Sequence, residues 1–275
     1  MPRVVRSAGR TVTSCPISVD PVIHLRGVVS VLGRFPALAG ADLDVARGEI
    51  VLLIGPNGAG KTSLLRVCAG LMPVASGRVV VLGHELPDER RALRRRVGWL
   101  GHANGLYDDL TVVENVRFWA RAAGAPMADV EAALNRLEIQ PRLWNVEAGR
   151  LSAGQRRRAA VSAMVVRRPE LWLLDEPHAG LDAQARDDFD ELVREAVAGG
   201  ATAVLASHEI ERGGALATRT VQVSGGVVVA DGLGSSPSSA GHEHPPAVDQ
   251  PPAQERVQDN HERVQDNVEG LHGVA

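Results

Sequence analysis

Residues 50–62 read IVLLIGPNGAGKT, and this stretch decides the fold. The apolar run at residues 50–54 has the length of a buried strand, far short of the roughly 20 residues that a membrane-crossing helix needs. Residues 55–62 match the pattern G-x-x-x-x-G-K-[ST] without a mismatch, and helical character follows. A strand, a glycine-rich turn and a helix in this order predict a phosphate-binding loop in an α/β domain.

The residue types in this loop suit a bound triphosphate. Glycines let backbone N–H groups turn inward, and the positive end of the following helix points at the same anion. Lys61 is expected to bridge the β- and γ-phosphates of ATP, and the hydroxyl of Thr62 to bind Mg²⁺. The residues expected to hold the nucleotide are Gly55, Pro56, Asn57, Gly58, Ala59, Gly60, Lys61, Thr62 and Ser63.

Lys61 is also the only lysine among 30 basic residues, the others being arginine. A position that keeps lysine in such an arginine-rich chain indicates a need for a compact ammonium, where the wide guanidinium fork does not fit.

The composition sets broad limits on function. The 275 residues suffice for one large domain or two small ones, and a formal net charge of −3 argues against a general attraction to nucleic acid. Cys15 and Cys68 are too few for a disulfide framework or a zinc site, so a reducing compartment fits best. We expect neither a signal peptide nor a membrane span, and any action at a membrane must pass through partners.

The periodicity predicts a mostly parallel α/β core with antiparallel strands before it and a helical insertion within it. Residues 22–45 alternate like two antiparallel strands, and the pattern from Pro87 to about Val166 is helical. The other expected strands are 79–82, 171–174, 202–206, 221–223 and 227–229, and the expected helices are 63–69, 114–123, 127–137, 155–166, 183–198 and a short one from Glu209.

We therefore expect one ATPase domain at residues 22–232, with its helical part at about 88–166, between disordered segments at 1–21 and 233–275. The tail repeats ERVQDN at 255–260 and 262–267. Its step of seven residues carries only one valine per unit, so a coiled coil is not predicted.

A second set of polar residues follows the later strands. Asp175 and Glu176 end the apolar run at 171–174, where buried acids are costly unless they serve a purpose. Asp175 is expected to bind Mg²⁺, and Glu176 to act as general base on the attacking water. His208, just past the strand at 202–206, is expected to contact the γ-phosphate and hold that geometry.

Three further segments complete a resemblance to the ATP-binding cassette (ABC) family, over roughly residues 22–230. Residues 151–155, LSAGQ, resemble the family's signature, with alanine at the third position. Residues 179–182 look like its D-loop, and Ser207-His208 like its switch histidine. The resemblance implies an ATPase that works as a head-to-tail pair. The signature residues implied to contact the ATP held by the other subunit are Ser152, Ala153, Gly154 and Gln155.

The resemblance also implies partners and a location. Hydrolysis would open the pair and move integral membrane permease subunits, with this chain peripheral on the cytoplasmic face of the cell membrane and no nucleic acid involved. Arg156, Arg157 and Arg158 continue the signature helix and are interpreted mostly as a solvated basic face. His102 stands where the family usually has the glutamine of the Q-loop, and that glutamine is a ligand of Mg²⁺. His102 is expected to take its place at the ion, directly or through water. Leu32 stands where an aromatic often stacks on adenine; Phe35 either substitutes for it or belongs to the core.

Residues 99–106, 110–119 and 151–158 look most like the ATP-binding subunit of the haem exporter of cytochrome c maturation. Drug and multidrug exporters carry similar cassettes and are the alternative. A soluble ABC ATPase is less favoured, because the chain has one cassette and only 90 residues separate Lys61 from Leu151. A non-catalytic regulatory cassette is disfavoured by the presence of Glu176 and His208.

Overall fold

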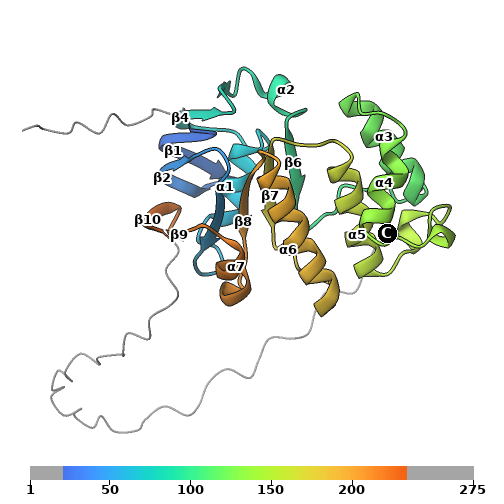
Figure 1. Ribbon diagram of the computed structural model, residues 1–275. Coiled ribbons are helices and arrows are strands. Elements are labelled where there is room, and N and C mark those ends of the chain that lie inside the picture. The colour runs from blue at the N-terminus through green and yellow to red at the C-terminus, as the bar shows by residue number, and fades with distance from the viewer. Residues whose placement is uncertain (1–20, 234–275) are drawn as a thin grey trace, which may run out of the picture. The chain divides into compact units, whose positions relative to one another are not determined.

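The computed structural model describes residues 21–233. Within this range lie two β-sheets, with helices packed against them and a group of helices to one side (Figure 1). The expected disordered segments fall almost wholly outside the described residues, so the domain boundaries stay a prediction. None of the helices in this range combines the length and apolarity that crossing a membrane requires.

The larger sheet contains β3, the strand that leads into the phosphate loop. In residues 21–233 its strands lie in the order β10-β9-β3-β8-β7-β6. The strands from β9 to β6 are parallel to one another, and β10 pairs antiparallel with β9 in a hairpin. Its central strands are buried on both faces, which explains their unbroken apolar runs. The bounds are β3 Ile50–Ile54, β6 Val97–Leu100, β7 Leu171–Asp175, β8 Thr202–Ala206, β9 Arg219–Ser224 and β10 Val227–Leu233.

The smaller sheet is antiparallel throughout the described chain and has the order β2-β1-β4-β5. Its first two strands form the hairpin that the alternating sequence at residues 22–45 predicts, with Ile23 opposite Val45 at the open end. The bounds are β1 Ile23–Leu32, β2 Phe35–Val45, β4 Ser76–Val81 and β5 His84–Leu86.

The helices agree closely with the predicted positions. The helix α6 has the predicted bounds, and α3 begins at a capping box in which Thr111 and Glu114 satisfy each other's backbone N–H groups. The bounds are α1 Lys61–Cys68, α2 Arg90–Leu93, α3 Val112–Ala123, α4 Asp129–Arg136, α5 Ala153–Val165, α6 Ala183–Ala198 and α7 Ile210–Leu216, with 3₁₀ turns at Pro141–Leu143 and Ala148–Arg150.

One expectation about the helical region was wrong. The pattern from Pro87 predicted helices only, whereas β6 adds an edge strand to the parallel sheet by pairing with β7. The four residues of β6 are too short to display a period, and their partners lie about 70 residues away along the chain. A side chain at Gly98 would lie 2.7 Å from the ring of Pro169, so the strand fits only with glycine there.

Three apolar cores hold these elements together. Along β3, Val51 and Leu53 face the first core, between the two sheets and around α1, whereas Ile50 and Leu52 face the second, under α6. This alternation is the period-two geometry of a strand. The third core joins α3, α4 and one face of α5, which lie together in Figure 1. The opposite face of α5 belongs to the second core, so this helix connects the two.

Cys68 gives a test of the first core. The side chain is 2% exposed at the end of α1, and burial raises the pKa of its thiol to about 12. Because the thiolate is the reactive form, the native protein at pH 8 should resist alkylation. In a Cys15→Ser variant, which leaves a single thiol, iodoacetamide labelling followed by mass spectrometry should be slow natively and fast in denaturant. Equal labelling rates in both conditions would contradict the burial.

Candidate active site

The phosphate loop lies at the carboxyl edge of the parallel sheet, between the last residue of β3 and the first turn of α1. Its entry depends on Gly55, whose φ is 145°. A β-carbon there would lie 2.1 Å from the carbonyl oxygen of Val223 on β9, so no side chain is possible without displacing the backbone. The loop is thereby held tightly against the neighbouring strand.

Two features of α1 suit an anion at this edge. No side chain caps its first turn, so the N–H groups at its positive end are free of side-chain partners. Lys61 Nζ donates to the carbonyl oxygens of Gly55 (2.6 Å) and Pro56 (3.1 Å), which keeps the ammonium over the loop. An ammonium and several N–H groups therefore face the same small volume.

Thr62 and Asp175 meet although 113 residues separate them in the chain. The hydroxyl of Thr62 donates to Asp175 Oδ1 at 2.9 Å. Asp175 is 8% exposed at the end of β7, the strand that lies beyond β8 from β3. The structure thus brings together the two residues that the sequence predicted as oxygen ligands of one cation.

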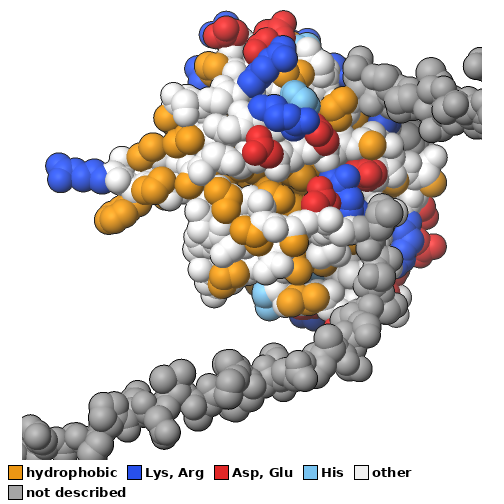
Figure 2. All heavy atoms as spheres, turned by 90° about the vertical axis from the view of Figure 1, so that its left-hand side faces the viewer, with side chains coloured by type: hydrophobic (Ala, Val, Ile, Leu, Met, Phe, Trp, Pro, Cys, Tyr) orange, Lys and Arg blue, Asp and Glu red, His pale blue; other side chains and the backbone are white. Residues whose placement is uncertain are grey.

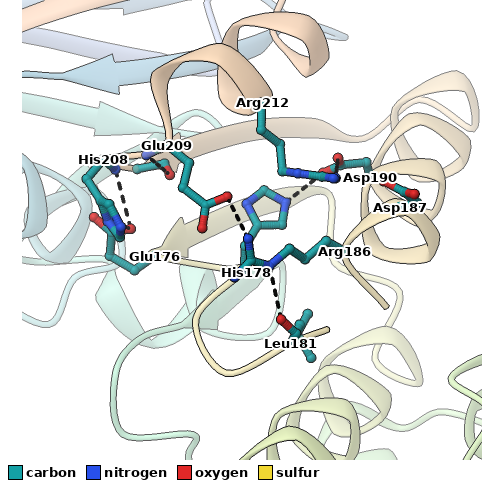
Figure 3. Close-up of polar contacts among 10 residues, drawn as sticks. Glu176, His178, Leu181, Arg186, Asp187, Asp190, His208, Glu209 and Arg212 are labelled. Atoms are coloured by element: carbon teal, nitrogen blue, oxygen red, sulfur yellow. Dashed lines mark hydrogen bonds and ion pairs between the residues drawn. The ribbon is translucent and has the colours of Figure 1, made fainter. Parts of the chain in front are cut away.

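Glu176 and His208 form a second pair, which Figure 3 shows facing each other. Glu176 Oε2 lies 2.7 Å from His208 Nδ1 and 3.4 Å from the backbone nitrogen of His208. The Glu176 side chain is 35% exposed, and its backbone has a left-handed φ of 47°. That conformation is rare outside glycine and turns the carboxylate away from the strand direction. The pair therefore presents a carboxylate to solvent beside the phosphate loop.

A cleft of about 490 Å³ joins the phosphate loop to Asp175 and Glu176, and His208 reaches it only through its contact with Glu176. The phosphate loop, Asp175 and Glu176 form one part of its lining, and Leu32 and Phe35 of the β1–β2 hairpin form another. Phe35 is 79% exposed and Leu32 63%, so Phe35 does not belong to the core. Figure 2, which views the side where β1, β2 and β10 lie in Figure 1, shows apolar side chains spread over this face. The hairpin thus offers an apolar surface at the mouth of a polar cleft.

The signature residues lie in a different cleft. Ser152 is the N-cap of α5 and forms a reciprocal capping box with Gln155, at 3.3 and 3.1 Å. Ser152, Gly154 and Gln155 line a cavity of about 250 Å³ that shares no lining residue with the phosphate-loop cleft. A β-carbon on Gly154 would lie 3.0 Å from the carbonyl oxygen of Gly180, so the helix packs closely on the loop after β7.

The structure does not bring His102 into the site. Its side chain is exposed, and it is not among the residues that line the phosphate-loop cleft. Within residues 21–233, no cluster of three or more His, Cys, Asp or Glu side chains is arranged to hold a metal ion. The oxygen pair of Thr62 and Asp175 is therefore the part of the predicted metal site that the structure assembles.

Arg157 is the residue whose role the sequence pattern missed. It is 3% exposed, unlike its half-buried neighbours Arg156 and Arg158, so the expected solvated face does not include it. Burial lowers its pKa to about 10, and the charges of Asp175 and Glu176 oppose that shift. Arg157 lies three and four residues before Ala160 and Val161, so it shares a helix face with these apolar residues. This spacing is the sequence signal that could have predicted its burial.

The Arg157 guanidinium joins three segments of the site. It donates to the carbonyl oxygens of Glu176 (2.8 Å), Pro177 (3.1 Å) and Asp175 (3.3 Å) at the end of β7. It also donates to Gly101 O at 2.7 Å, in the segment that contains His102. The signature helix, the segment after β6 and the acidic end of β7 are thereby held by one side chain.

A parallel sheet with a phosphate loop at its carboxyl edge, facing an acid on another strand, defines a P-loop nucleotide hydrolase. Comparison with known proteins makes this more specific. The family model described as ABC transporter matches residues 38–179. A solved structure of an ATP-binding subunit of an ABC transporter is 27% identical with a TM-score of 0.72, over 77% of this chain and 90% of that chain.

Similar sequences include an export protein and a drug-resistance protein. The cytochrome c biogenesis ATP-binding export protein CcmA of Cupriavidus pinatubonensis is 38% identical over 200 residues, which are 72% of this chain and 88% of that protein. The daunorubicin resistance ATP-binding protein DrrA3 of Streptomyces coeruleorubidus is 37% identical over 220 residues, 78% of this chain and 68% of that protein. The chain therefore belongs to the ABC transporter family as an ATP-binding subunit, and its activity is ATP hydrolysis. The predicted family and fold class are confirmed.

Arg157 yields a stability prediction. Replacing it with Met removes the hydrogen bonds that Arg157 donates to five acceptors, four of them backbone carbonyls, so the free energy of unfolding should fall by about 3 kcal/mol. Urea unfolding followed by circular dichroism measures this. Arg158→Met is the matched control, because its partners Glu138 and Asp182 lie 3.4 and 3.7 Å away at the surface. Its loss should stay below about 1 kcal/mol, and equal losses for the two variants would contradict the role of Arg157.

Proposed function

We propose that this chain is the ATP-hydrolysing subunit of a haem exporter that serves cytochrome c biogenesis. The observation that carries the proposal is the naming of its relatives. Proteins named as cytochrome c biogenesis ATP-binding export proteins from Cupriavidus, Rhodopseudomonas, Bordetella and Roseobacter are 36–41% identical to it. These relatives match up to 90% of their own length, so the likeness covers nearly the whole of those proteins.

The phosphate loop supplies the binding half of the mechanism. The N–H groups at the start of α1 and the Lys61 ammonium bind the β- and γ-phosphates of ATP. Thr62 and Asp175 fit a magnesium ion, because Mg²⁺ prefers oxygen ligands and takes most of its coordination from phosphates and water. When bound, the ion neutralises charge that develops on the phosphate oxygens. His102, a nitrogen donor outside the cleft, would contact it only through water.

Glu176 and His208 supply the hydrolytic half. The Glu176 carboxylate accepts a proton from the water that attacks the γ-phosphorus, and the bond to the bridging oxygen breaks to give ADP and phosphate. His208, 2.7 Å from that carboxylate, orients it and presents its other ring nitrogen to the γ-phosphate. Both groups follow the carboxyl ends of neighbouring strands, β7 and β8, which supports their acting together on one phosphate group.

The signature cleft supports a head-to-tail pair. Ser152 and Gly154 line a cleft with no residue in common with the phosphate-loop cleft of the same chain. The positive end of α5 therefore faces a site that its own nucleotide does not occupy, and a second subunit would bring an ATP to it. A solved ABC cassette of the same fold is a dimer bound to ADP and phosphate.

Permease subunits would transmit the motion to the membrane, with this chain peripheral on the cytoplasmic face. A third cleft, of about 390 Å³, supports a contact with an apolar partner element. Trp99, Trp119 and Met164 line it, and the guanidinium of Arg167 stacks over the ring of Trp119 at 5.2 Å. Aromatic, methionine and arginine side chains are enriched in protein–protein contacts.

Drug export is the second candidate. The daunorubicin resistance protein DrrA3 is nearly as similar as the relatives named for cytochrome c biogenesis, and its match extends over more of this chain. The cassette itself does not separate the two, because the cargo would pass through the permease subunits.

Glu176→Gln tests the hydrolytic assignment. Loss of the base should lower kcat for ATP hydrolysis by about 100-fold or more, while ATP still binds and traps a closed dimer. Phosphate release measures turnover, and size-exclusion chromatography with and without ATP measures the dimer. Lys61→Ala is the companion variant and should lose tight ATP binding, so it should form no trapped dimer. Hydrolysis at the parental rate by Glu176→Gln would remove Glu176 from its role.

Haem staining of membranes tests the cargo. Cells lacking this gene should lose covalently haem-bound cytochrome c, and wild type but not Glu176→Gln should restore it. The difference between the wild-type gene and the Glu176→Gln gene ties the phenotype to ATP turnover by this chain. Unchanged staining in the deletion strain would set haem export aside, and a gain of sensitivity to daunorubicin in the same strain would favour the drug exporter.

A further inference from the structure

The loop between β7 and α6, residues 176–182, carries the carboxylate of Glu176 at one end and the N-cap of α6, Asp182, at the other. Its own backbone bonds are two short turns, Ala179 N to Glu176 O and Leu181 N to His178 O, each 3.2 Å. Turns of this kind do not fix a loop in place by themselves. The position of the loop therefore depends on contacts with neighbouring elements.

His178 is a second buried anchor of this loop, in addition to Arg157, which bonds the carbonyls of Glu176 and Pro177. It is 2% exposed, and its ring lies edge-on to Phe189 of α6, with the ring centres 5.6 Å apart. Its Nε2 lies 2.7 Å from Asp190 Oδ1, while Nδ1 is buried without a hydrogen-bond partner in the described part of the chain. A phenylalanine would fill the same space without stranding a polar nitrogen. The contact with Asp190 is thus what a histidine adds here.

Asp190 extends the contact to the segment that carries His208. Its other carboxylate oxygen accepts from Arg212 of α7 at 2.6 Å, and Arg212 also pairs with Asp187 at 2.8 Å. The helix α7 begins two residues after His208. Figure 3 shows the chain of contacts from His178 through Asp190 to Arg212, with α6 on one side.

A second connection runs parallel to the first. Arg186, one helical turn before Asp190 on α6, donates from Nε to Leu181 O (3.0 Å) and from Nη1 to Glu209 (3.1 Å). It therefore also joins the loop after β7 to the segment after β8. Residues four apart share one face of a helix, so this face of α6 holds both segments.

We propose that His178 is a positioning residue for ATP hydrolysis. Its contact with Asp190 of α6, which also binds Arg212 of α7, fixes the loop of Glu176 relative to the segment of His208. The helix α6 thereby helps to set the distance between the Glu176 carboxylate and the His208 imidazole. The inference rests on the proposed roles of Glu176 and His208. Such control matters because a shift of about 1 Å in a reacting group can cost about 100-fold in rate.

His178→Phe and His178→Gln form the test, each in the full chain. Phe keeps the ring against Phe189 and loses the bond to Asp190, so kcat should fall at least about tenfold. The KM for ATP should stay within about twofold, because the phosphate loop is untouched. Gln retains an N–H donor at the corresponding reach and should recover most of the rate. Asp190→Asn should lower kcat by about as much as His178→Phe does. Arg212→Met should also lower kcat, and the double variant His178→Phe/Arg212→Met should have a kcat no lower than that of the slower single variant.

Glu195→Gln is the control. It removes a surface pair with Arg136 (2.9 Å) at the far end of the same helix and should leave kcat unchanged. A parental kcat in both His178→Phe and Asp190→Asn overturns the proposal. So does an equal loss in the Phe and Gln variants together with lowered melting temperatures, which is the mark of a packing defect. A raised KM at constant kcat overturns it in favour of nucleotide binding.

The outcome is separable from the proposed function. Normal turnover in both His178→Phe and Asp190→Asn, beside an inactive Glu176→Gln, removes only this inference. Parental turnover in Glu176→Gln removes the proposed base, whatever His178 does. The haem assignment does not enter, because ATP turnover by the purified chain involves no cargo.

Discussion

A single buried guanidinium fastens the helical part of the molecule to the edge of the parallel sheet. Arg157 sits in the first half of α5 and donates to carbonyl oxygens at the end of β7 and to Gly101 after β6. A cation in so dry a place is expensive unless every donor is used, and here its nitrogens find carbonyl and amide oxygens. The signature helix cannot shift against Glu176 without breaking these bonds.

The same site shows which features a sequence can and cannot predict. The phosphate loop was predictable because its geometry is local: Gly55 and Lys61 lie six residues apart, in an order that dictates strand, turn and helix. The pairing of Thr62 with Asp175 was inferred across 113 residues only because both ends carry motif residues. The predicted bounds of α6 hold in the structure, where the Asp182 side chain accepts from Ala185 N and caps the first turn.

What escaped the sequence depends on partners elsewhere in the chain. The strand β6 exists because β7 pairs with it, and four residues contain no such information. Arg157 looks like its neighbours Arg156 and Arg158 until the fold buries one of the three. His178 gave no signal, since a histidine after a proline is unremarkable until Asp190 lies beside it. Propensity and period report on local chain geometry, whereas these roles arise from tertiary contacts.

The helix α5 belongs to two of the three cores. Ala159 and Ala163 pack with α3 and α4, while Ala160, Val161 and Met164 pack against the parallel sheet. Opening either core exposes one side of this helix, so its backbone amides exchange with solvent only when both interfaces are lost. In a native-state hydrogen-exchange experiment the signature helix would belong to the slowest-exchanging group, together with the central strands. A segment at the edge of the working site would then be among the last parts of the protein to come apart.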